Sequence, residues 1–169
     1  MLVTPERLTP SAFAPFGAVL AHDGSAARAV NAGTARRTDL VGLADRDAGA
    51  APALAVYRLS AQTLPLPVDL FERHPGSPQV FAALTVERFL VVVAPAGPDG
   101  LPDPAGARAL VGARGDAIRY RRDLWHAPMV ALGADGDMLM FAFERGAGGD
   151  TIEHRLPVAL LVADPTTPA

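Results

Sequence analysis

Glycine and proline are spread along the whole chain, and this feature limits the possible fold more than any other. The 169 residues include 16 Gly and 16 Pro. Proline interrupts helices and strands, and both residues serve tight turns. The chain is therefore predicted to form many short elements joined by turns, without long helices. Because half of the residues are hydrophobic, a single domain spanning residues 1–169 can still bury a sizeable core.

Short apolar segments between these breakers are predicted to be β-strands. The expected strands cover residues 54–59, 79–84, 88–94, 117–121 and 138–143, the last being the final clear strand. Segment 89–93 (Phe-Leu-Val-Val-Val) is apolar on both faces, so we expect it to lie between two sheets rather than at an edge. Repeated short strands with turn signals favour an all-β sandwich or barrel with a few short helices.

Two short helices and three loops complete the prediction. Thr9-Pro10 is typical of a helix start and predicts a short helix through Phe13. Asp103-Pro104 predicts a second helix of one or two turns, running to about Val111. The expected loops cover residues 21–35, 44–51 and 146–150.

Composition excludes several kinds of chemistry and partner. The sequence contains no cysteine and no lysine, which rules out thiol nucleophiles, disulfides and lysine Schiff bases. A formal net charge of −3 gives no general attraction to nucleic acid. The start of the chain lacks a signal-peptide pattern, and the longest apolar run, 89–95, is far shorter than the roughly 20 residues of a membrane helix. We expect a cytoplasmic protein without a nucleic-acid or membrane partner.

Polar residues of catalytic or metal-binding type concentrate in three segments, 72–79, 120–128 and 144–150. In an extended strand, positions two apart share a face, so Glu72 and His74 point the same way. The spacing of Glu72, His74 and Gln79, followed later by His126, resembles the two cupin motifs, which usually supply His-x-His, a Glu and a second-motif His. These four residues are the predicted metal ligands. Oxygen and imidazole ligands suit Ni, Mn, Fe or Zn.

Two separated motifs carry a resemblance to a known family. Glu72-Arg73-His74-Pro75 with Gln79-Val80-Phe81, and Tyr120-x-Arg122-x-x-Trp125-His126-x-Pro128, resemble the signatures of the ureidoglycolate lyase family. Further matches are the opening Leu8-Thr9-Pro10-x-x-Phe13-x-x-Phe16-Gly17, Asn31-Ala32-Gly33 and the 89–93 strand, so the resemblance covers nearly the whole chain. The sequence departs from the family pattern at Gly76-Ser77-Pro78, Arg119, Ala127 and Glu144.

This resemblance implies a cupin-type, jelly-roll-like fold and a specific reaction. Family members cleave (S)-ureidoglycolate to glyoxylate and urea in allantoin and purine degradation, and they form homodimers. The reaction needs a base for the substrate hydroxyl and an acid for the departing urea nitrogen, and histidine suits both roles near pH 7. His74 and His126 are therefore the predicted catalytic residues. A divalent metal, Ni or Mn, is the expected cofactor, and no organic cofactor is expected.

Substrate binding is predicted for Gln79, Asn31, Arg119 and Arg121. Arg119 and Arg121 lie on the strand face opposite Ile118 and Tyr120; they bind the substrate carboxylate if that face lines the cavity, and contact solvent if it does not. Asn31 either contacts substrate or serves a turn.

Two alternatives from other functional classes stay open. One is a cupin enzyme with another activity, such as a sugar isomerase, a metal-dependent oxygenase or an enzyme acting on another ureido or hydroxy acid. The other is a non-catalytic cupin that binds a small molecule. Retention of both histidines within the family signature favours the lyase.

Overall fold

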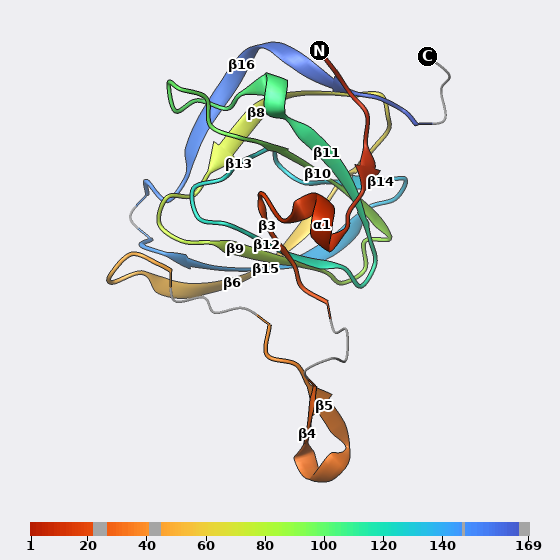
Figure 1. The fold of residues 1–169 in the computed structure, drawn as a ribbon, viewed down its shortest axis with the longest axis vertical. Helices are drawn as coiled ribbons and strands as arrows, with labels where there is room; N and C mark the ends of the chain where they lie inside the picture. The colour runs from red at the N-terminus through yellow and green to blue at the C-terminus, as the bar shows by residue number, and fades with distance from the viewer. Residues whose placement is uncertain (22–26, 41–44, 147, 166–169) are drawn as a thin grey trace.

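Two β-sheets packed face to face form the body of the protein (Figure 1). The computed structural model describes residues 1–21, 27–40, 45–146 and 148–165. The first sheet has the order β1 (Leu2–Val3), β16 (Ile152–Val162), β8 (Leu66–Arg73), β13 (Trp125–His126), β10 (Arg88–Ala94), β11 (Arg108–Ala113) and β2 (Glu6–Arg7), with β14 (Val130–Leu132) beside β10 and β7 (Ala61–Gln62) beside β14.

The second sheet contains the remaining strands of the sandwich. Its order is β3 (Gly17–Val19), β12 (Ala117–Tyr120), β9 (Gln79–Ala83), β15 (Gly136–Glu144) and β6 (Ala51–Leu59). The predicted all-β sandwich is confirmed, and among the described residues the two sheets do not close into one barrel. The predicted first helix is α1 (Pro10–Phe13), where the Thr9 side chain accepts a hydrogen bond from the Ala12 N–H.

Strand β10 is buried on both faces, as its apolar sequence predicts. Phe89, Val91 and Val93 belong to the core between the two sheets. Leu90 and Val92 alternate with them and pack into a second core, built almost entirely from residues of the first sheet itself. Strand β10 therefore lies in the interior of the molecule. The second sheet packs on one of its faces, and other strands of its own sheet cover the other face.

The second predicted helix is wrong beyond its first turn. Asp103 caps the N–H of Ala105, but only a 3-10 turn, η2 (Pro104–Gly106), follows. The chain then enters β11, because antiparallel pairing with β10 satisfies its backbone and buries Leu110 in the core. Pairing with a distant strand outweighed the weak local preference for a helix.

The longest strand, β16, was missed, so the 138–143 segment is not the last strand. Its 11 residues include charged side chains and Pro157, and the register against β8 shifts between Arg155 and Leu160. That bulge interrupts the regular alternation by which strands are recognised. Its partner β8 is long and has a matching register on both sides of the bulge.

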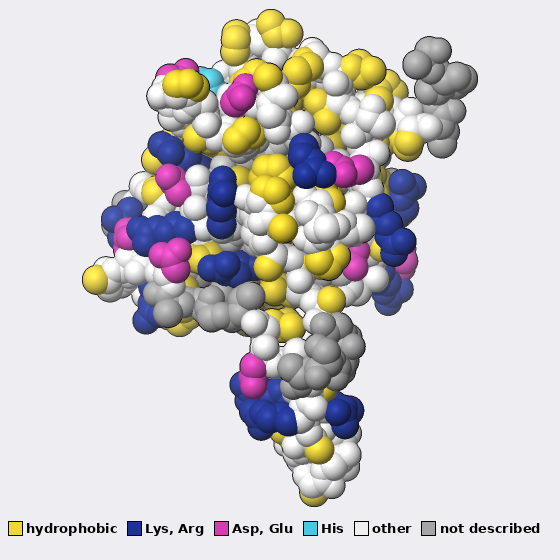
Figure 2. Space-filling view, viewed as in Figure 1, with side chains coloured by type: hydrophobic (Ala, Val, Ile, Leu, Met, Phe, Trp, Pro, Cys, Tyr) yellow, Lys and Arg dark blue, Asp and Glu magenta, His cyan; other side chains and the backbone are white. Residues whose placement is uncertain are grey.

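The predicted loop over 21–35 contains regular structure that the sequence did not reveal. Residues 28–37 form a separate hairpin of β4 (Arg28–Val30), η1 (Asn31–Gly33) and β5 (Ala35–Arg37). The hairpin projects from the sandwich, and basic side chains gather on it (Figures 1 and 2). His22 and Ala44 lie outside the described residues, and the 44–51 loop ends where β6 begins at Ala51.

The turn between β8 and β9 carries the chain from the first sheet to the second. Glu72 lies at the end of β8 and Gln79 at the start of β9. Ser77 anchors the turn, because its buried hydroxyl accepts from the Phe143 N–H at 3.0 Å and lies 3.0 Å from the Phe143 carbonyl oxygen. The predicted polar segment 72–79 therefore spans the gap between the sheets.

Candidate active site

Glu72, His74 and His126 converge between the two sheets. Backbone pairing of β8 with β13 sets His126 directly opposite Glu72. Glu72 Oε1 lies 3.6 Å from His126 Nε2 and 3.8 Å from His74 Nε2, and the two imidazole rings are 5.3 Å apart between centroids. Each residue offers one ligand atom, and the three atoms all lie within 4.8 Å of one another. The predicted common face of Glu72 and His74 is observed.

Backbone carbonyl groups fix which nitrogen of each histidine faces Glu72. His126 Nδ1 lies 2.9 Å from the Leu124 carbonyl oxygen, and His74 Nδ1 lies 3.1 Å from the Asp150 carbonyl oxygen. A carbonyl oxygen only accepts, so both Nδ1 atoms carry a hydrogen. In a neutral ring the bare Nε2 then faces the carboxylate. Three hydrogen-bond acceptor atoms that lie this close together need positive charge between them, and either protons on the rings or a metal ion can supply it.

The two histidines also hold the Glu72 carboxylate in its charged form. The close approach of the His126 side chain, and then of the His74 side chain, lowers the pKa of Glu72 from 4.5 to about 2, although partial burial acts in the opposite direction. A carboxylate that stays charged throughout the physiological pH range is better suited to bind a cation than to act as a proton-accepting base.

These residues line a pocket of about 250 Å³ between the sheets. Its lining residues are Tyr57, Leu59, Glu72, His74, Gln79, Phe81, Tyr120, His126, Ala127, Pro128, Met129 and Thr151. Four of its buried polar atoms have no hydrogen-bond partner among the described residues: Gln79 Oε1, Tyr120 Oη and the Nε2 atoms of His74 and His126. Burying such groups unpartnered costs roughly 1–3 kcal/mol each. The pocket is therefore built to hold a polar ligand, a metal, or both.

Tyr120 is a hydrogen-bond donor within this pocket. It is 1% exposed, and its ring stacks on His126 with centroids 4.3 Å apart. Burial and the Glu72 carboxylate raise the pKa of Tyr120, so the phenol keeps its hydrogen. Gln79 on the neighbouring strand β9 lies directly opposite Tyr120, and the side-chain oxygen of Gln79 also has no hydrogen-bond partner among the described residues.

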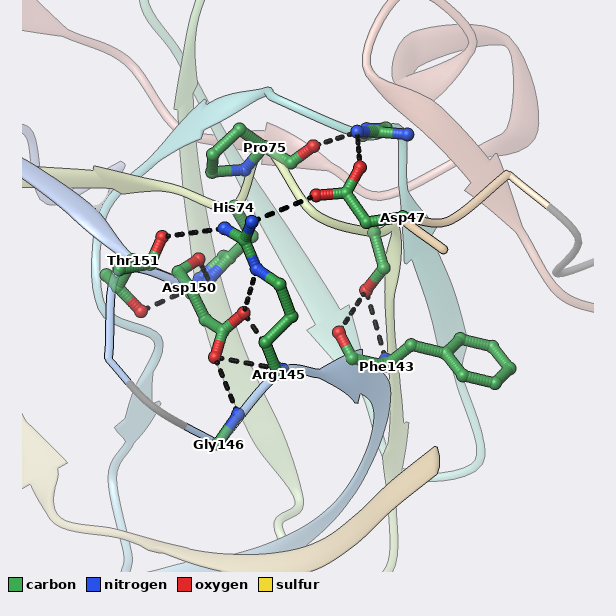
Figure 3. A network of polar contacts seen from close by, with 11 residues as sticks. Asp47, His74, Pro75, Phe143, Arg145, Gly146, Asp150 and Thr151 are labelled. Carbon is green, nitrogen blue, oxygen red and sulfur yellow. Dashed lines mark hydrogen bonds and ion pairs between the residues drawn. The ribbon is translucent and has the colours of Figure 1, made fainter. Parts of the chain in front are cut away.

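An ion-pair network behind the pocket holds His74 in place (Figure 3). The Asp150 carboxylate accepts from the Arg145 N–H at 3.1 Å and the Gly146 N–H at 3.3 Å, which fixes the carbonyl group that contacts His74. The hydrogen bond from the Arg145 backbone is the main reason that the pKa of Asp150 is lowered. Arg145 pairs with Asp150 and Asp47.

Asp47 continues this network to the β8–β9 turn. Arg122 donates hydrogen bonds to both the Asp47 carboxylate and the Pro75 carbonyl oxygen. The turn that carries His74 is therefore clamped by residues from three distant segments.

The structure gathers four of the seven predicted site residues in the pocket and places the others elsewhere. Glu72, His74, Gln79 and His126 line the pocket, but Asn31, Arg119 and Arg121 are not among its lining residues. Asn31 is an exposed residue with a φ of 51° in the projecting hairpin. Exposed Arg121 donates to the Pro15 carbonyl oxygen at 2.8 Å, and Arg119 lies on the outer face of the second sheet.

Sequence reasoning missed the pocket roles of Tyr120, Tyr57 and Thr151. Thr151 Oγ1 lies 3.3 Å from His74 Nδ1, and the Tyr57 ring meets Phe81 edge-on at 5.8 Å. The alternation of residues 117–121 placed Tyr120 on the same face as Ile118 without deciding which face is the inner one, and alternation carries no information about an unpartnered hydroxyl. Only the packing of the two sheets reveals it.

The fold and the pocket together define an all-β protein in which a carboxylate and two histidines form a candidate metal site between the sheets. A model of the ureidoglycolate lyase family matches residues 1–163, and the chain belongs to that family. It is 37% identical to the ureidoglycolate lyase of Burkholderia mallei strain NCTC 10229 over 94% of this chain and 92% of that protein. It is 34% identical to the ureidoglycolate lyase of Azotobacter vinelandii over 90% of this chain and 91% of that protein.

Two further findings complete the comparison. A solved dTDP sugar isomerase from Desulfovibrio desulfuricans G20 aligns with a TM-score of 0.43 and 15% identity over 78% of this chain and 81% of that chain, a likeness too distant to support a conclusion. No helix among the described residues is long and apolar enough to cross a membrane.

Proposed function

We propose that this enzyme cleaves (S)-ureidoglycolate into glyoxylate and urea, a step of allantoin and purine degradation as the family resemblance implies. The observation that carries the proposal is the convergence of two histidine Nε2 atoms and Glu72 in one pocket of a family member. The pocket is large enough for a small hydroxy acid bearing a urea group. A cytoplasmic location stays a prediction.

The reaction is the reversal of an addition to an aldehyde. A base removes the hydroxyl proton, the C–N bond breaks as the carbonyl group forms, and the urea nitrogen gains a proton. If the site works without a metal, Nε2 of His74 or His126 is the group proposed to take the hydroxyl proton, because each is bare when the ring is neutral. Glu72 is unsuited to that role, since its lowered pKa makes it a weak base.

We propose Glu72, His74 and His126, with the nearby Gln79 oxygen, as the residues that would hold a divalent metal, Ni or Mn. The donor set fits: two imidazole nitrogens with backbone-fixed tautomers and a carboxylate oxygen lie within 4.8 Å of one another. A bound metal would lower the pKa of the substrate hydroxyl and neutralise negative charge. No arginine is among the residues that line the described pocket, so the substrate carboxylate has no other cation there.

Substrate contact by Gln79 is part of the proposal, because its oxygen is buried and unpartnered in the pocket. The substrate-binding roles of Asn31, Arg119 and Arg121 stay predictions, and the pocket is proposed without them.

The test follows glyoxylate and urea release from freshly prepared ureidoglycolate against its uncatalysed decay. We expect rapid release by the wild type and a loss of at least about 100-fold in His74→Ala and in His126→Ala. His154→Ala is the matched control, because His154 packs edge-on to Trp125 at 6.3 Å and does not line the pocket. Loss on chelation and recovery with Ni or Mn supports the metal; activity that survives chelation contradicts it. No release above decay in any metal would overturn the lyase.

A homodimer is the proposed assembly, and the outer face of the second sheet is its proposed interface. Leu54 and Val56 on β6 are 69% and 62% exposed, and cross-strand pairing sets Phe141 and Leu139 beside them. Exposed apolar faces of this kind mark association sites. Light scattering of the wild type and of Val56→Glu tests the assembly: a dimer that the charge converts to monomer supports this face, and an unaffected dimer contradicts it.

A further inference from the structure

One wall of the pocket is aromatic and carries no charge. Tyr57, Phe81 and Tyr120 form this aromatic wall, in which Phe81 meets both tyrosines edge-on, at 5.8 Å and 6.0 Å between ring centroids. Tyr57 is 44% exposed and Tyr120 is 1% exposed, so the wall runs from the surface to the interior. It ends where Tyr120 stacks on His126.

The two parts of the pocket differ in chemistry in the same way as the two parts of the substrate. The cluster of Glu72, His74 and His126 would hold a cation, and a cation held there would attract the carboxylate and hydroxyl of ureidoglycolate. The ureido group is flat and neutral, and it has a strong acceptor in its carbonyl oxygen. A flat neutral group packs well on aromatic rings, and its carbonyl oxygen needs a donor.

Tyr120 supplies a donor that the folded protein leaves unused. Its hydroxyl is buried without a hydrogen-bond partner among the described residues, although most buried hydroxyls have one. An isolated buried donor lowers stability, so the remaining candidate for its partner is a molecule that enters the pocket.

We propose that the aromatic wall is the subsite for the departing urea group and that the Tyr120 hydroxyl donates a hydrogen bond to the urea carbonyl oxygen. The inference rests on the proposed function. When the C–N bond breaks, its electron pair moves onto the urea nitrogen and is shared with the carbonyl oxygen, until a proton reaches the nitrogen. A donor on that oxygen stabilises the charge as it develops and therefore speeds the cleavage.

Tyr120→Phe tests the inference, because it removes only the hydroxyl. In the metal state that supports wild-type activity, kcat is expected to fall roughly 100-fold, the effect of losing one donor to developing charge. Inhibition by added urea is expected to weaken at least about threefold, because urea loses one hydrogen bond. Inhibition by glyoxylate is expected to stay the same, because glyoxylate binds at the other part of the pocket.

Thermal unfolding separates this role from a structural one. Removing an unpartnered buried hydroxyl is expected to raise the melting temperature by about 2–4 °C, whereas removing a structural hydrogen bond lowers it. Wild-type rates in Tyr120→Phe, unchanged urea inhibition or a lower melting temperature would each overturn the assignment while leaving the lyase intact. An inactive wild type would instead overturn the proposed function, and this inference with it.

Discussion

Replacing Glu72 by glutamine keeps the shape of the side chain and removes its charge from between the two histidines. The structure gives the magnitude. A pKa lowered from 4.5 to about 2 means that the charged carboxylate contributes roughly 3 kcal/mol to folding stability in the metal-free protein. Because the pKa is lower in the folded state, this contribution is complete above pH 4.5 and disappears as the pH falls towards 2.

The assay is urea unfolding of metal-free wild type and Glu72→Gln between pH 6 and pH 3. Glutamine cannot titrate, so the difference between the two free energies of unfolding reports on the carboxylate together with its coupling to the two histidines. We expect this difference to shrink by roughly 2 kcal/mol between pH 6 and pH 3. Other carboxylates titrate in both proteins and cancel.

Glu87→Gln is the matched control. Glu87 pairs with Arg114 at the surface, where both side chains are about 60% exposed. The difference in free energy of unfolding between Glu87→Gln and the wild type is expected to change by less than about 1 kcal/mol between pH 6 and pH 3. If the difference in free energy of unfolding between Glu72→Gln and the wild type depends on pH as little as this control does, the reasoning that the histidines hold Glu72 charged is refuted.

Three further predictions test the framework around the site. Gly136→Ala is expected to lower the free energy of unfolding by about 1–3 kcal/mol in urea denaturation, because an added Cβ would overlap the backbone of Val86. Asp47→Asn weakens the Arg122 clamp on the His74 turn; steady-state kinetics are expected to give a kcat/KM about 10-fold lower, and an unchanged value would contradict the clamp. Arg114→Ala removes only an exposed ion pair and is expected to change stability by less than about 1 kcal/mol by thermal unfolding.

The strongest sequence predictions were those that depend on local periodicity. An extended strand puts residues 72 and 74 on one face wherever the strand lies, and their side chains do share the site. The apolar run 89–93 had to be buried on both faces for the same reason, since neither side offers a polar residue to water. Turn residues predicted short elements and the first helix correctly.

Predictions that depend on distant partners were the weakest. Residues 108–113 became a strand through pairing with β10, and residues 152–162 became the longest strand through pairing with β8 across a bulge. Neither segment shows its partner in its own sequence. The hairpin of β4 and β5 was likewise hidden among small and polar residues.

The sequence by itself determined the chemistry that this protein carries: two histidines, a carboxylate and an amide at a spacing typical of one family, with no thiol and no lysine amine. Tertiary structure alone decided how those groups act. Pairing of β13 with β8 brought His126 to Glu72, and the carbonyl group of Asp150, distant in the sequence, fixed the tautomer of His74. The packing of the two sheets left the Tyr120 hydroxyl without a partner among the described residues. The physical reason is that periodicity acts within a segment, whereas hydrogen bonding and burial depend on which segments meet.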